Sequence, residues 1–213
     1  MSTLLPAYSR LEDNLNTASH AIGSFFSIFG TVLLTVYAIN TSNAWAVVSA
    51  IIYGASLITL FSASAIYHSI ENPRIRRLMQ RFDHIAILYL IAGTFTPFAL
   101  VSLQSLWGWL VFGFVWFCAI TGTIVHLTPL RRYHLLMVAL NLIMGWSALL
   151  LVVPLIEAIE PMGFGMLVAG GITYTLGLVF YLNDRIWLNH FIWHLFVLMG
   201  ASLHFFTVLL YVL

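Results

Sequence analysis

Long apolar stretches separated by short polar breaks run along the whole chain. A helix that crosses the hydrocarbon core of a membrane, about 30 Å thick, needs about 20 apolar residues. Seven stretches reach this length, and no internal repeat or long linker divides them. We therefore predict an all-α integral membrane protein: a seven-helix transmembrane bundle in a single domain over residues 1–213, with a short cytoplasmic N-terminal tail at 1–18. The expected spans are residues 19–40, 45–70, 82–102, 107–128, 133–153, 162–182 and 187–212.

Basic residues occur only in alternate connections between these stretches. All eight are arginine, namely Arg10, Arg74, Arg76, Arg77, Arg81, Arg131, Arg132 and Arg185. The connections at 40–44, 101–106 and 154–161 contain none of them. Because short arginine-bearing loops stay in the cytoplasm, we expect a cytoplasmic N-terminus and an external or periplasmic C-terminus. The predicted location is the inner cell membrane, as a multi-pass protein.

The weakest break in this pattern lies between the third and fourth expected spans. Residues 85–127 are almost continuously apolar, with only a short polar group at 102–105. If this stretch were counted as one span, Arg131 and Arg132 would lie on the opposite side of the membrane from the arginines at 74–81. The arginine distribution therefore favours seven spans.

The composition agrees with the hydropathy pattern and limits the classes of binding partner. Hydrophobic residues make up 62% of the chain and charged residues 7%, whereas soluble domains carry about 25% charged residues. A net charge of +1 gives no basis for nucleic-acid binding. Membrane lipid is the expected partner and a candidate substrate, and no soluble protein partner can be inferred. The single cysteine, Cys118, excludes internal disulfides and cysteine-rich zinc modules, so histidine and carboxylate would have to hold any metal.

Polar and ionisable side chains collect at one predicted depth, where they are functional candidates. Ser64 and His68 lie near the end of the second span, and Asp83 is expected to open the third. His190 and His194 open the seventh span at a spacing that puts both imidazoles on one helix face. Under the predicted topology, all five lie at cytoplasmic helix ends.

Three histidines from two helices form a candidate metal site. Three neutral imidazoles around Zn²⁺ leave one coordination position open, as in catalytic zinc sites. Asp83 would then orient a bound water and transfer its proton, and Ser64 would hydrogen-bond a ligand, the water or the substrate. Two alternatives stay open: interfacial histidines often bind only backbone or water, and Asp83 can pair with Arg81. Ligand type alone also permits another imidazole-binding metal.

A further row of polar residues lies along the start of the first span. Asp13, Asn16 and His20 are spaced three and four residues apart, which places them on one helix face. The alternative role is ordinary helix capping, which either Asp13 or Asn14 would perform well.

These motifs together resemble the haemolysin III family, the bacterial branch of the progestin and adiponectin Q receptor superfamily. The similarity rests on Ser64-x3-His68, Asp83 in its Arg-Phe-Asp-His context, and His190-x3-His194, and it runs over nearly the whole chain. The resemblance implies a zinc site near the cytoplasmic face, with the three histidines as ligands and Asp83 holding the zinc-bound water. The family's first motif usually has glutamate at the position of Asp13.

The resemblance also implies competing functions. The superfamily is similar to membrane hydrolases that include alkaline ceramidases, which favours zinc-dependent hydrolysis of a lipid amide or ester. The animal relatives are described as receptors, which favours a non-enzymatic sensor of membrane state with a structural zinc. A pore-forming cytolysin fits poorly, because the spans contain few charged groups to line a wet pore.

Overall fold

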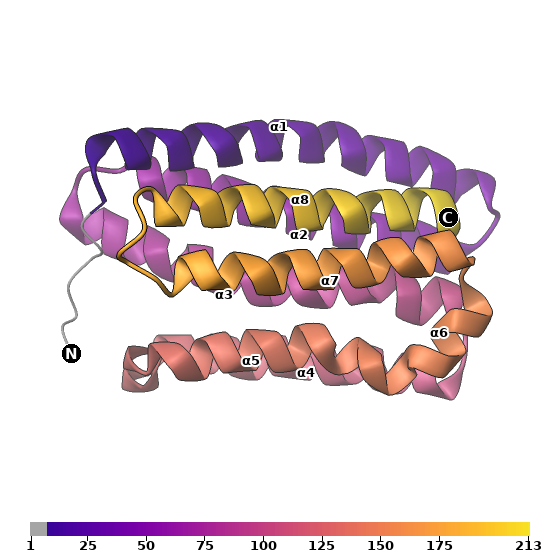
Figure 1. The fold of residues 1–213 in the computed structure, drawn as a ribbon. Helices are drawn as coiled ribbons and strands as arrows, with labels where there is room; N and C mark the ends of the chain where they lie inside the picture. The colour runs from indigo at the N-terminus through magenta and orange to yellow at the C-terminus, as the bar shows by residue number, and fades with distance from the viewer. Residues whose placement is uncertain (1–7) are drawn as a thin grey trace.

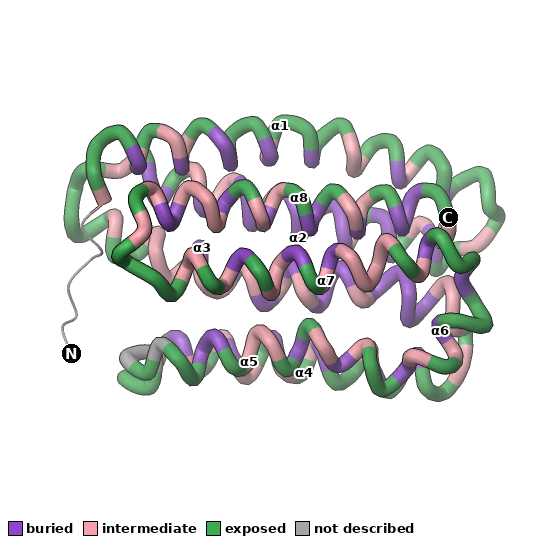
Figure 2. Tube along the Cα trace, in the orientation of Figure 1, coloured by how far each residue is buried: buried purple, intermediate pink, exposed green. Residues whose placement is uncertain are grey.

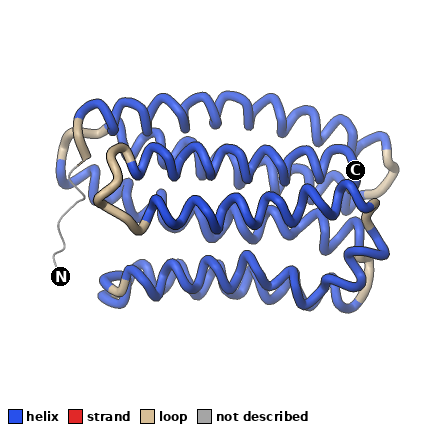
Figure 3. Tube along the Cα trace, viewed as in Figure 1, coloured by secondary structure: helices blue, strands red, loops and turns tan. Residues whose placement is uncertain are grey.

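The computed structural model describes residues 8–213, except for the side chains of residues 131, 132 and 134, and residues 1–7 of the predicted tail lie outside it. Over the described residues the chain forms helices and connecting turns without strands (Figure 3). The eight α-helices are α1 (Arg10–Asn40), α2 (Ala44–Ser69), α3 (Pro73–Pro97), α4 (Leu106–Leu127), α5 (His134–Trp146), α6 (Val152–Ala158), α7 (Pro161–Tyr181) and α8 (Asn189–Tyr211).

Seven helical segments of the described chain are long and apolar enough to cross a membrane, as predicted. The third continues from α3 through a π-helical turn at Phe98–Ser102. The fifth joins α5 to α6 through a 3-10 turn at Ser147–Leu151. The third segment ends at Ser102 and α4 begins at Leu106, so the break at 102–105 is a helix boundary. The prediction of seven spans is confirmed.

Side-chain caps explain where several helices begin. Ser9 caps α1 by accepting the backbone N–H of Glu12, and Asn43 caps α2 by accepting that of Trp45. Asn72 caps α3, with Pro73 in the first turn, and the fixed φ of proline suits that position. Each cap satisfies a backbone donor that has no partner inside its helix.

Two helices begin earlier than the apolar pattern indicates. The first span was expected from residue 19 and the third from residue 82, whereas α1 begins at Arg10 and α3 at Pro73. The expected opening position of Asp83 is therefore wrong, because this residue lies inside α3. Both helices start at a cap in polar sequence, and hydropathy detects the start of the apolar segment, not the start of the helix.

The helices pack side by side along one common direction (Figure 1). Helix α1 contacts both α2 and α8, α3 lies against α2 and α4, and α7 lies against α8. Buried positions face the inside of the bundle and exposed positions face outward (Figure 2). The outward surface is apolar, as Phe25, Phe26 and Phe29 of α1 show. This distribution fits a protein whose surroundings are lipid.

Gly108 of α4 marks the tightest backbone approach that a substitution can test. A Cβ at this position would collide with the carbonyl oxygen of Ala99, which is backbone and cannot turn aside. We expect Gly108→Ala to lower the free energy of unfolding by about 1–3 kcal/mol, as overpacking typically does. Thermal unfolding in detergent measures the effect. Gly113→Ala is the matched control, because nothing lies within 4 Å of its added Cβ, and equal stability of the two variants would contradict the expectation.

Candidate metal centre

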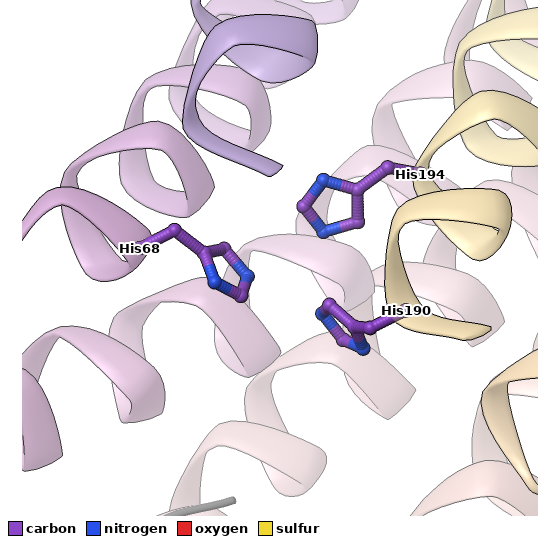
Figure 4. A group of neighbouring side chains, drawn as sticks. All are labelled: His68, His190 and His194. Atoms are coloured by element: carbon purple, nitrogen blue, oxygen red, sulfur yellow. The ribbon is translucent and has the colours of Figure 1, made fainter. Parts of the chain in front are cut away.

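The side chains of three buried histidines lie close together (Figure 4). They lie at the end of the bundle where α1 begins. His68 comes from the last turn of α2, and His190 and His194 come from the first two turns of α8. One ligand nitrogen from each ring lies within 4.8 Å of the other two. The structure therefore brings together the three histidines that were predicted as metal ligands.

Helix α1 is the element that connects the two halves of this cluster. It packs along α2 on one side and against α8 on the other. His190 and His194 share a helix face without any contact to another helix, because one helical turn separates them. His68 lies beside them because both of these helices pack against α1.

Unpaired nitrogen atoms test whether these residues fit a metal. The Nε2 atoms of His68 and His190 are buried and have no hydrogen-bond partner. Buried polar groups are nearly always satisfied, so each exception calls for an explanation such as an ion. A divalent metal at the centre of the three rings would accept both lone pairs. Neutral imidazole is also the ligand type that zinc prefers, so the residues fit the predicted metal.

Asp83 and Ser64 form a neighbouring polar pair. Asp83 is buried inside α3, and its carboxylate lies within interaction range of the Ser64 hydroxyl of α2. It is not one of the clustered ligand groups. It also makes no ion pair with Arg81 in the described part of the chain, so that alternative role is not observed. Tyr8 and Tyr181 lie within electrostatic range of Asp83, and both rings contact His190.

The polar row of α1 lies against the histidine cluster. Asp13 Oδ1 lies 3.0 Å from His68 Nδ1. The Asn16 amide lies 3.4 Å from the same nitrogen. The His20 ring stacks on His194 with 3.6 Å between centroids. Because Ser9 caps the helix, the row is not explained by capping.

Sequence reasoning missed four residues that contact this cluster or its neighbours. Tyr8 and Ser19 reach ring nitrogens of histidines, and Glu12 Oε1 accepts the backbone N–H of His190 at 3.1 Å. Arg76 Nη2 donates to Asp13 Oδ1 at 2.6 Å. Burial raises the pKa of the Tyr8 phenol well above its ordinary value. Ser19 lies one turn after Asn16 on the same face of α1, so its position could have been found from the sequence. Nothing in the sequence indicates that the other three residues lie near the cluster.

The histidine that lies deeper in α8 has a different role. His204 is buried, and its Nε2 lies 3.1 Å from the carbonyl oxygen of Leu167 in α7. His204 therefore forms a hydrogen bond between α8 and α7. His84, in turn, lies beside His126, with 5.9 Å between ring centroids. Neither residue belongs to the three-histidine cluster.

Comparison with known proteins gives matches over nearly the whole chain. The sequence model of a family described as "Haemolysin-III related" matches residues 8–205. "Hemolysin-3" of Bacillus cereus is 40% identical over 202 residues, which is 95% of this chain and 92% of that protein. "Hemolysin-3 homolog" of Bacillus subtilis (strain 168) is 38% identical and covers 94% of each chain. The human "Monocyte to macrophage differentiation factor" is 30% identical over 92% of this chain and 83% of its own length.

Proposed function

This chain belongs to the haemolysin III family, and we propose that it is a zinc-dependent membrane hydrolase that cleaves an amide or ester bond of a membrane lipid. The observation that carries the proposal is the buried cluster of His68, His190 and His194, in which two Nε2 atoms have no partner. Three neutral ligands leave a position open for water or substrate, unlike the four protein ligands of structural zinc sites.

His68, His190 and His194 would hold the zinc through their ring nitrogens. Zinc in such a site lowers the pKa of water and polarises a carbonyl group. Asp83 is buried beside Ser64 and lies within electrostatic range of Tyr8 and Tyr181, whose rings contact His190. In the proposed reaction a carboxylate oxygen of Asp83 accepts a proton from the attacking water and returns it to the leaving nitrogen or oxygen. Ser64 holds that carboxylate in place.

A lipid substrate follows from where the cluster lies. The described chain spans a membrane with seven apolar segments, and its outward surface carries large apolar side chains. A lipid can enter such a protein sideways from the bilayer, whereas a polar solute would have to lose its hydration to enter the buried site. The reacting group would be a carbonyl near the lipid headgroup, because the cluster lies at the ends of α2 and α8 and not at their middle.

The direct test is turnover by the purified, metal-loaded protein. We expect release of fatty acid from at least one member of a panel of ceramides, acyl amides and phospholipids. We expect that release to stop when a chelator removes the metal and to return when Zn²⁺ is restored. Protein that holds one metal per chain and turns over none of the panel would overturn the hydrolase proposal.

A second function is favoured by the position of the cluster between helices. His68 lies on α2 and the other two histidines on α8, and both helices contact α1. A metal at this point would link α2 to α8 directly. In this alternative the zinc is structural, and the protein senses the state of the membrane through a change in helix packing.

A further inference from the structure

All three histidines of the cluster direct one ring nitrogen toward a single short segment. This segment, residues 8–19, comprises Tyr8, the Ser9 cap and the first turns of α1. Each contact uses the Nδ1 atom of the histidine. The pairs are Tyr8 Oη with His190 at 3.1 Å, Asp13 Oδ1 with His68 at 3.0 Å, and Ser19 Oγ with His194 at 3.4 Å.

The chemistry of two partners fixes which nitrogen carries the proton. An ionised carboxylate only accepts hydrogen bonds, so we assign the Nδ1 proton of His68 to its 3.0 Å contact with Asp13. This contact is shorter than the 3.4 Å contact with Asn16 Nδ2, which could only donate to that nitrogen. The Ser19 hydroxyl already donates to the carbonyl oxygen of Asn16 at 3.0 Å. Its oxygen is therefore left to accept from His194 Nδ1. In both rings the proton lies on Nδ1, and the lone pair of Nε2 is free for a ligand.

His190 is held at two points by the same segment. Its backbone N–H donates to Glu12 Oε1, a carboxylate that meets the positive end of α8 where no local side chain caps the helix. Its Nδ1 meets the Tyr8 hydroxyl, and the two rings are in contact with centroids 4.7 Å apart. The Nε2 atom of His190 has no partner. Glu12 thus holds the backbone of His190, and Tyr8 holds its ring at Nδ1 and along one face.

We propose that residues 8–19 are the positioning segment of the metal site: Asp13 and Ser19 hold His68 and His194 in the tautomer that presents Nε2, and Tyr8 holds the His190 ring in place through its Nδ1. This inference rests on the proposed metal site and deepens it, because it makes metal affinity depend on residues that are not ligands. Partners of this kind typically change metal affinity by about 10–100-fold when they are lost.

Tyr8→Phe is the sharpest test, because it keeps the ring and removes only the hydroxyl. We expect the purified full-length variant to bind Zn²⁺ about 10–100-fold more weakly than the unmodified protein in competition with a chelator. Asp13→Asn, which removes the charge but keeps the size, should weaken binding over a similar range. Tyr37→Phe and Asp184→Asn are the matched controls, because both residues are exposed and, among the described residues, neither makes a hydrogen bond or ring contact with a cluster histidine.

Two further measurements separate positioning from general destabilisation. Thermal unfolding of the metal-free protein should differ little between Tyr8→Phe and Tyr37→Phe. The visible spectrum of bound Co²⁺ should change in Tyr8→Phe and not in Tyr37→Phe, because only the first variant releases the His190 ring. Unchanged affinity and an unchanged spectrum in Tyr8→Phe, with metal lost in His190→Ala, would overturn the positioning role and leave the metal site standing. Absence of metal binding in the unmodified protein would overturn both.

Discussion

His68→Ala, His190→Ala and His194→Ala should each abolish tight metal binding by the purified protein. Removal of one ring leaves two imidazoles in a group whose ligand atoms all lie within 4.8 Å of one another. A zinc site with only two protein ligands is well below the three or four that such sites normally have. We expect the loss to exceed the roughly 10–100-fold typical of a residue that only supports a ligand. Elemental analysis after purification measures it.

His204→Gln is the control for this set. His204 is also a buried histidine of α8, but it hydrogen-bonds Leu167 and is not one of the clustered ligand groups. We expect this variant to keep its metal, although its stability should fall with the loss of an interhelical contact. Full metal retention in all three cluster variants would refute the site.

The number of spans and the pairing of His190 with His194 could be predicted because both signals are local in the sequence. Hydropathy over about 20 residues finds a spanning segment wherever its neighbours lie. The spacing of His190 and His194 fixes a shared helix face by geometry alone. His68 required one further step, the equal depth of helix ends, and the arginine distribution supplied it.

The surroundings of the cluster could not be predicted in the same way. Tyr8 and Glu12 reach His190 only because the start of α1 packs beside the start of α8. Arg76 reaches Asp13 because α3 begins at Pro73, earlier than the apolar pattern indicates. These contacts depend on how helices distant in sequence pack together, and hydropathy carries no information about that.

Asp83→Asn should reduce lipid hydrolysis about 10²–10⁴-fold, the range typical of general acid–base catalysis, while metal binding stays close to normal. An asparagine keeps the size of the side chain and a hydrogen-bond acceptor for Ser64, but it cannot take up a proton at neutral pH. Asp83 is not one of the clustered ligand groups, so its replacement leaves all three imidazoles in place. Turnover of the best lipid in the panel and metal content, measured on the same preparation, check both expectations.

The same variant separates the enzyme from the sensor. If the zinc is structural, His68→Ala should lower the unfolding temperature strongly. Asp83→Asn should then change neither the unfolding temperature nor the metal content by much, because Asp83 would take part in no reaction. If the protein is a hydrolase, Asp83→Asn should remain folded and metal-bound yet lose its activity. Ser64→Ala should have a smaller effect than Asp83→Asn, since it loosens the carboxylate without removing it. Wild-type turnover by metal-loaded Asp83→Asn would exclude Asp83 as the proton carrier, whichever metal is bound.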